Sequence, residues 1–120
     1  MNKQFIAKKG EDLACNFITN NGYKIIERNF RIRGGEIDII AIDNQTLVYI
    51  EVKTRTNLRF GRPEESVNKR KFKFLERAAK FYKVNRKASN LPLHERIDVV
   101  SVDLTDQNRP QLSLIKNAEI

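Results

Sequence analysis

The chain has 120 residues, of which 40% are hydrophobic, with 23 Lys and Arg residues against 15 Asp and Glu residues. This length and apolar content predict a single folded domain over residues 1–120 and exclude an intrinsically disordered chain. The net charge of +8 favours nucleic acid or another anionic surface as the partner, and a basic protein without such a partner is the alternative.

Cysteine, histidine and apolar runs exclude several further classes. One cysteine, Cys15, excludes an internal disulfide and any metal site built from several cysteines. His94 is the one histidine and lies in a predicted loop, which gives no support to zinc or histidine-centred chemistry. No apolar run has the length of a secretory signal or a membrane span, so we expect a cytoplasmic protein without a membrane partner.

Residues 3–21 predict an amphipathic helix, because apolar side chains recur at helical spacing. Gly22, directly after the two asparagines that close this segment, offers the left-handed conformation that commonly ends a helix. Glu11 projects near the edge of the apolar stripe. From the helix pattern alone, Glu11 is a glutamate at the boundary between core and solvent.

Residues 23–33 predict a strand that turns at Gly34 and Gly35 into the next apolar run. Three arginines give this strand a basic side: Arg28, Arg31 and Arg33. They would either contact phosphates, with Arg33 as the candidate nucleic-acid ligand, or lie solvated on the surface.

Residues 35–53 read GEIDIIAIDNQTLVYIEVK and carry the main functional signal. Two apolar runs, residues 37–42 and 47–52, are separated by a polar and turn-prone link, which predicts an antiparallel hairpin. Three charged residues interrupt the hairpin where a core strand is expected to be apolar, namely Asp38, Glu51 and Lys53.

The length of the link predicts the register of this hairpin. With residues 43–46 as the loop, Ile42 faces Leu47. Counting back from that pair places Asp38 directly opposite Glu51, with Cβ atoms roughly 4.5–5.5 Å apart. A slip of one residue would break this arrangement.

The predicted pair of carboxylates requires a neutralising partner. Glu51 and Lys53 point to one face of the sheet and Val52 points to the other. Like charges opposed across two strands destabilise a sheet, and a cation bound by hard oxygen ligands would relieve this, which predicts Mg²⁺ or Mn²⁺ as the cofactor. The alternative is that Lys53 simply forms a salt bridge with Asp38 or Glu51.

After Lys53 the chain reads TRTNLRFGRPEES, which predicts a loop that leads into a helix. A basic loop beside a metal site could bind the phosphate backbone of a nucleic acid. The arginines expected to do so are Arg55, Arg59 and Arg62.

Residues 64–85 predict the second helix. Its inner stripe comprises Val67, Lys71, Phe74, Leu75, Ala78 and Tyr82, with the ammonium of Lys71 free to reach solvent. The candidates for phosphate contacts on its outer side are Lys69, Arg70, Lys73 and Arg77. Glu76 is the one acidic residue between residues 66 and 94, so this face favours phosphate neutralisation over the alternative of a merely solvated face.

Residues 96–102 predict a buried strand that runs parallel to a neighbour across the helix, and residues 112–116 predict a short last strand. Asp98 would either join the acidic site or, as the favoured interpretation, pair with an arginine or cap a turn. The order αβββαββ predicts an α/β sandwich with a mixed central β-sheet flanked by helices.

Two levels of resemblance follow from these residues. Asp38, followed thirteen residues later by Glu51, Val52 and Lys53, resembles the PD-(D/E)xK signature of the restriction-endonuclease-like nucleases. The phrases GEIDII, YIEVKTR, FGRPEESV and RIDVV resemble the bacterial YraN family of predicted endonucleases, which is related to archaeal Holliday junction resolvases. The resemblance covers residues 5–117, and Ile37 stands where a proline sometimes precedes the aspartate.

The resemblance implies a restriction-endonuclease-like fold and a set of roles. Glu11, in the phrase KGEDLA, matches a first-helix glutamate that lies by the metal as a third ligand or as a binder of water there. The backbone carbonyl of Val52 would be a further ligand beside Asp38 and Glu51. Lys53 would orient the attacking water and stabilise charge on the phosphorane-like transition state, or act as the base if its pKa were depressed.

The first functional hypothesis is therefore a metal-dependent endonuclease that hydrolyses phosphodiester bonds in branched or otherwise structured DNA. RNA remains open as a substrate, and a homodimer is expected by analogy, since cutting both strands of a junction needs two sites. The alternative is a nucleic-acid-binding module with the nuclease fold that is inactive alone or requires a partner. A third hypothesis is a protein-interaction role in which the basic helix docks an acidic partner.

Overall fold

The computed structural model of the chain describes residues 2–57, 68–86 and 90–118. The elements follow the order α1 (Lys3–Asn20), β1 (Lys24–Ile32), β2 (Gly35–Asp43), β3 (Thr46–Arg55), α2 (Lys69–Asn85), β4 (His94–Asp103) and β5 (Gln111–Ile115). The predicted order of one helix, three strands, one helix and two strands is confirmed.

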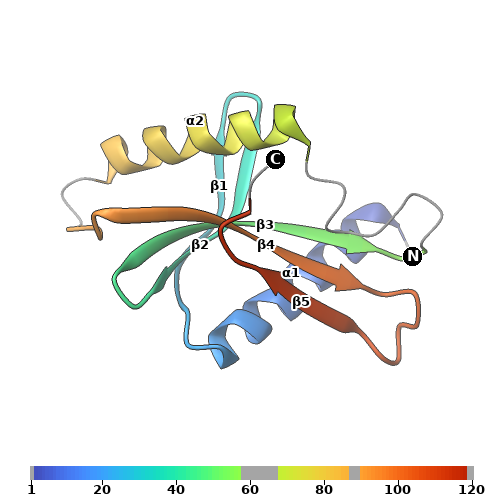
Figure 1. Ribbon diagram of the computed structural model, residues 1–120. Coiled ribbons are helices and arrows are strands. Elements are labelled where there is room, and N and C mark those ends of the chain that lie inside the picture. The colour runs from blue at the N-terminus through green and yellow to red at the C-terminus, as the bar shows by residue number, and fades with distance from the viewer. Residues whose placement is uncertain (1, 58–67, 87–89, 119–120) are drawn as a thin grey trace.

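The strands form one mixed sheet in the order β1-β2-β3-β4-β5. Only the β3–β4 pair is parallel, and α2 makes the crossover that a parallel pair requires. The helices lie on opposite faces of the sheet, with α2 above it and α1 below it in the view of Figure 1. The predicted α/β sandwich with a mixed central sheet is therefore confirmed.

Each face of the sheet has its own apolar core. Between α1 and the sheet, the core contains Ile18 of the helix together with Ile39 and Ile50 of the sheet. Beneath α2 it contains Leu75 and Tyr82 of the helix, which the helical stripe predicted, packed against sheet residues such as Tyr49. These two cores fix the helices on the sheet and so position the ends of the strands between them.

Both helices end or begin with recognisable caps. Gly22 has φ +92° and follows α1 as predicted. The start of α2 differs from the prediction: Asn68 is extended and accepts a hydrogen bond from the Lys71 amide at 2.9 Å, so the helix begins at Lys69. The predicted helical residues 64–67, including Val67 of the inner stripe, lie outside the described residues.

His94 is the first residue of β4, so its predicted place in a loop is wrong. In the part of the chain that the structure describes, neither helix has the length and apolar character needed to cross a membrane.

Candidate metal centre

The candidate centre lies where β2 separates from β3. The predicted register is confirmed at the Ile42–Leu47 pair, and pairing continues as far as Ile39 and Ile50. The next residues along the two strands are Asp38 and Glu51, and they are the first ones beyond the paired region.

At the separation the side chain of Asp38 replaces a strand contact. Its Oδ2 accepts a hydrogen bond from the Val52 amide at 2.8 Å. The alternation of β2 also changes here, because Ile37 and Ile40 pack in the core beneath α2 whereas Ile39 packs in the core beneath α1. The predicted direct pairing of Asp38 with Glu51 is thus replaced by a local opening that still keeps their carboxylates adjacent.

Asp38 is a buried carboxylate with an unfavourable charge beside it. Asp38 is 8% exposed. Its burial and the negative charge of Glu51 together raise the pKa of Asp38 to about 8. The Val52 amide opposes this rise, and Glu11 adds to it. The free carboxyl group therefore favours binding either a proton or a cation.

Three carboxylates from two elements converge at this point. Glu11 of α1 and Glu36 and Asp38 of β2 each offer an oxygen, and these oxygens lie within 4.8 Å of one another. The sequence analysis had singled out Glu11 and Asp38 but missed Glu36. The signal for Glu36 was available, because a residue two positions before Asp38 shares its side of a strand.

Neighbouring polar groups hold the outer part of this cluster. Asn29, in the left-handed region at φ +53°, donates from Nδ2 to Glu11 Oε1 at 2.9 Å and to Glu36 Oε1 at 3.3 Å. Arg31 Nε donates to Glu36 Oε2 at 2.9 Å. Residues of β1 thus orient one oxygen of Glu11 and both oxygens of Glu36.

A close helix–strand contact brings Glu11 to the sheet. A Cβ atom on Gly10 would lie 2.0 Å from Thr54 Oγ1 and 3.0 Å from Thr54 Cβ. Glycine at this position therefore allows α1 to approach β3 more closely than any other residue would. Glu11, the next residue of the helix, reaches the centre as a consequence.

Glu51 is held between two lysines. The residue is 4% exposed, Lys53 Nζ lies 3.7 Å from Oε1, and Lys71 Nζ lies 3.3 Å from Oε2. The predicted alternative for Lys53, a salt bridge with one of the acids, is thus present for Glu51. Lys71 was predicted to reach solvent from the inner stripe of α2, and its contact with Glu51 was missed.

An open cleft of about 670 Å³ lies between α1 and the separated strands. All the predicted centre residues border it: Glu11, Asp38, Glu51, Val52 and Lys53. Glu36 and Arg55 line it as well. The structure therefore brings the predicted constellation together around one accessible space.

The donor set fits a hard divalent cation. Carboxylate oxygens with room for water are the ligands that Mg²⁺ and Mn²⁺ prefer. Glu51 Oε2 is buried and has no hydrogen bond within the described residues, although the Lys71 ammonium lies at ion-pair distance. A buried carboxylate oxygen without a hydrogen bond is an uncommon feature, and it adds a further hard oxygen donor to those that border the cleft.

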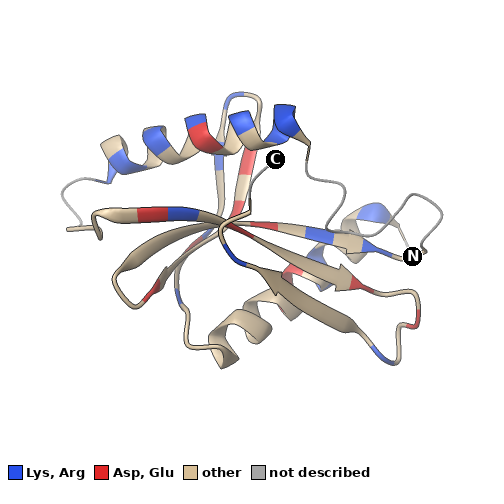
Figure 2. Cartoon of the chain, in the orientation of Figure 1, with Lys and Arg blue, Asp and Glu red and all other residues tan. Residues whose placement is uncertain are grey.

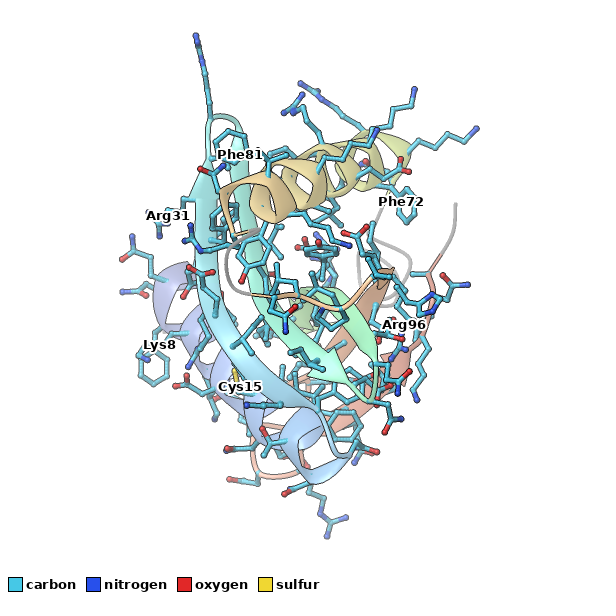
Figure 3. The ribbon with its side chains drawn as sticks, turned by 90° about the vertical axis from the view of Figure 1, so that its left-hand side faces the viewer. Lys8, Cys15, Arg31, Phe72, Phe81 and Arg96 are labelled. Carbon is cyan, nitrogen blue, oxygen red and sulfur yellow. The ribbon has the colours of Figure 1, made fainter. Side chains whose placement is uncertain are left out.

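The predicted nucleic-acid ligands on α2 form a basic surface, and the first turn of this helix reaches the centre through the contact of Lys71 with Glu51. The four residues predicted on α2 are all exposed, namely Lys69, Arg70, Lys73 and Arg77, and Lys80 of the same helix is exposed as well. Figure 2 shows the basic bands along this helix, and Figure 3 shows nitrogen-tipped side chains projecting from its outer side. The helix has one acidic residue, Glu76.

The β1–β2 turn continues this surface. Arg33 is exposed just before Gly34, and a Cβ atom on Gly34 would lie 3.4 Å from Arg77 Nη2. Arg55 lines the cleft, and its buried Nε has no hydrogen bond with any described residue. Arg59 and Arg62 lie outside the described residues.

Asp98 belongs to a different site. It accepts hydrogen bonds from the Tyr23 hydroxyl at 2.7 Å, Arg96 Nε at 2.9 Å and the Asn117 amide at 2.9 Å. Its favoured interpretation as the partner of an arginine is confirmed, and it plays no part in the acidic cluster.

Comparison with known proteins finds a family and relatives that resemble this chain over most of its length. A model described as the uncharacterised protein family UPF0102 matches residues 10–102. A UPF0102 protein of Caldicellulosiruptor saccharolyticus is 42% identical over 119 residues, which cover 98% of this chain and 99% of the relative. A UPF0102 protein of Dehalococcoides mccartyi is 44% identical over 117 residues, covering 98% and 94% of the two chains.

Proposed function

The chain belongs to the uncharacterised protein family UPF0102, and from that premise and the geometry of the centre we propose that it is a metal-dependent endonuclease. The proposed reaction is hydrolysis of phosphodiester bonds in DNA, with branched or otherwise structured DNA as the substrate. The observation that carries the proposal is the convergence of Asp38 and Glu51, with Lys53 beside them, where two strands separate into a cleft.

The cofactor in this proposal is Mg²⁺ or Mn²⁺, held by Asp38 and Glu51 with Glu11 or Glu36 in support. The Val52 backbone carbonyl is the proposed further ligand. Such a cation would supply an activated water and a polarised phosphate. The unsatisfied Glu51 Oε2 and the clustered oxygens of Glu11, Glu36 and Asp38 support this assignment.

The protein's own side chains divide the remaining tasks. Asp38 is oriented by the Val52 amide, which fixes its carboxylate toward the cleft. Lys53 lies at the cleft with its ammonium 3.7 Å from Glu51 Oε1, where it can donate hydrogen bonds to a phosphate and stabilise developing negative charge.

The substrate proposal rests on charge. A phosphodiester backbone that enters the cleft would lie near the basic surface of α2 and the β1–β2 turn. Lys69, Arg70, Lys73 and Arg77 would contact phosphates, which positions the substrate without reading its sequence. This arrangement supports recognition of backbone shape over base sequence.

The test is cleavage of a panel of four-way junctions, flaps, nicked duplexes and single strands of DNA, and of matching RNA, with Mg²⁺ or Mn²⁺. The wild type is expected to cut a structured DNA, and Glu51→Gln is expected to abolish cutting. Glu76→Gln is the matched control, because it removes an exposed glutamate from α2 outside the centre. Equal activity of wild type and Glu51→Gln would contradict the proposal.

A second candidate function is a nucleic-acid-binding module that does not cut alone. The observation that favours it is the neutralisation of Glu51 by two lysines, which gives that carboxylate counter-charge without a metal. Binding of the panel with a steep salt dependence and no cleavage would support this function. Measurement of the mass in solution, alone and with a junction, would then test the proposed homodimer or a requirement for a partner.

A further inference from the structure

Lys71 connects the basic helix to the acidic centre. It lies in the first turn of α2, three residues after Asn68, and its ammonium reaches Glu51 Oε2 at 3.3 Å. The Asn68 side chain fixes the Lys71 backbone by accepting its amide hydrogen bond at 2.9 Å. The start of the helix is therefore anchored, and the position of the ammonium depends on the side chain alone.

The contact has the character of a replaceable counter-ion. Glu51 Oε2 is buried, yet the approach of Lys71 does not satisfy it with a hydrogen bond. The Lys71 side chain is 30% exposed, and its ammonium also lies 5.3 Å from the centre of the Phe74 ring. After leaving the carboxylate, the ammonium can therefore be hydrated by solvent and can contact the face of the Phe74 ring.

Lys53 and Lys71 differ in this respect. Lys53 lines the cleft from the same strand as Glu51 and approaches Oε1 at 3.7 Å. Lys71 approaches the other oxygen from α2 and is not among the residues that border the cleft. A cation bound by Glu51 through Oε2 would share that oxygen with the Lys71 ammonium.

We propose that Lys71 is the exchangeable counter-ion of Glu51, and that a divalent cation displaces its ammonium when it binds the centre. This inference rests on the proposed function, since it assumes a cation site at Glu51. Lys71 is a positioning residue in this scheme: it keeps a buried carboxylate compensated without metal and weakens metal affinity by competing for the same oxygen.

The test is a calorimetric titration of Mn²⁺ into the DNA-free protein. Lys71→Met, which keeps the aliphatic stem and removes the charge, is expected to bind Mn²⁺ about tenfold more tightly than wild type. Lys80→Met is the matched control, because Lys80 is an exposed lysine of α2 outside the proposed metal and nucleic-acid ligands, and it is expected to bind Mn²⁺ like wild type. Unchanged or weaker binding by Lys71→Met would overturn the inference.

Thermal unfolding separates competition from simple packing. In EDTA, Lys71→Met is expected to melt below wild type, because Glu51 loses a counter-charge. Saturating Mn²⁺ is expected to close most of this gap, since the cation replaces the lost ammonium. A gap of the same size with and without Mn²⁺ would assign Lys71 a purely structural role and overturn the inference.

These outcomes stay distinct from those of the proposed function. A protein that binds Mn²⁺ more tightly as Lys71→Met, yet cuts no nucleic acid, sustains the exchange and contradicts the nuclease. If neither wild type nor Lys71→Met binds Mn²⁺, both the exchange and the proposed metal-dependent reaction are overturned.

Discussion

Asp98 on β4 and Glu51 on β3 are two buried carboxylates on adjacent strands, but they differ in how fully their oxygens are hydrogen-bonded. Asp98 is fully buried and accepts hydrogen bonds from Tyr23, Arg96 and Asn117. Glu51 is 4% exposed, and its Oε2 has no hydrogen bond within the described residues. Complete hydrogen bonding is the mark of a structural carboxylate, whereas an unsatisfied one beside a cleft indicates a binding role.

The surroundings explain the difference between these two carboxylates. Asp98 pairs with Ile50 of β3, and the next residue, Val99, pairs with Ile115 of β5. Arg96 links Asp98 to Asp43, whose Oδ2 lies 2.6 Å from Arg96 Nη2. Glu51 lies where β2 has left β3, so its neighbourhood contains Asp38 and a cleft rather than a closed network. Separation of the two strands thus places a buried carboxylate at the border of a cleft.

Substitution of Asp98, the structural carboxylate of this pair, is expected to change stability the most. Asp98→Asn is expected to lower the free energy of unfolding by about 3 kcal/mol, because it removes the charge of a fully buried carboxylate that pairs with the half-buried guanidinium of Arg96. Urea unfolding measures the change, and Asp106→Asn on an exposed turn is the control. A loss below that of the control would show that Asp98 is not a structural anchor.

At the centre, by contrast, a substitution is expected to raise the free energy of unfolding. Asp38→Asn removes a buried charge next to Glu51 and keeps an oxygen for the Val52 amide, so the cation-free protein should gain about 2 kcal/mol at pH 8. The gain should shrink toward pH 5, where wild-type Asp38 is already protonated in the folded state. Urea unfolding in EDTA at both pH values measures it.

The sign follows from proton linkage. The pKa of Asp38 is about 8 in the folded protein against about 4 when unfolded, so between these values the folded state binds more protons. This carboxyl group therefore makes the wild type lose stability as the pH rises from about 4 to 8, and Asp38→Asn should lack that component. An equally steep decline in Asp38→Asn would contradict the assignment.

A smaller effect tests the residue that the sequence analysis missed. Glu36→Gln is expected to weaken Mn²⁺ binding about tenfold, equivalent to about 1.4 kcal/mol, because it removes one charged oxygen from the cluster with Glu11 and Asp38. Glu76→Gln is the control for the loss of one negative charge. Similar affinities for both variants would leave Glu36 as a simple partner of Arg31.

Much of the hairpin could be predicted because local rules determine it. The polar link and the two-residue alternation of strands gave the Ile42–Leu47 pair, and the structure has that pair. The arginine partner of Asp98 could also be predicted, because Arg96 lies two residues away on the same side of the strand.

The remaining features of the centre depend on how elements meet. The departure of β2 from β3 at Asp38 interrupts the alternation that a sequence pattern assumes. Helical spacing placed Lys71 on the inner side of α2 but could not show which carboxylate it would meet. Glu36 becomes part of the cluster only when α1 brings Glu11 against the sheet.

The close packing of α1 on the sheet can be tested at Gly10, where we expect a smaller change in stability than at Asp98 or Asp38. In an open helix, Gly10→Ala would stabilise the protein by about 1 kcal/mol, since glycine is a poor helix former. Here the new Cβ would meet Thr54 Oγ1 at 2.0 Å, so we expect a net loss of about 1 kcal/mol and weaker Mn²⁺ binding as Glu11 moves outward. Adding Thr54→Ala should restore much of both quantities, because it removes the hydroxyl and the methyl group that the Cβ meets. If Gly10→Ala alone were as stable as wild type with unchanged Mn²⁺ affinity, the close approach of α1 would not be what delivers Glu11 to the centre.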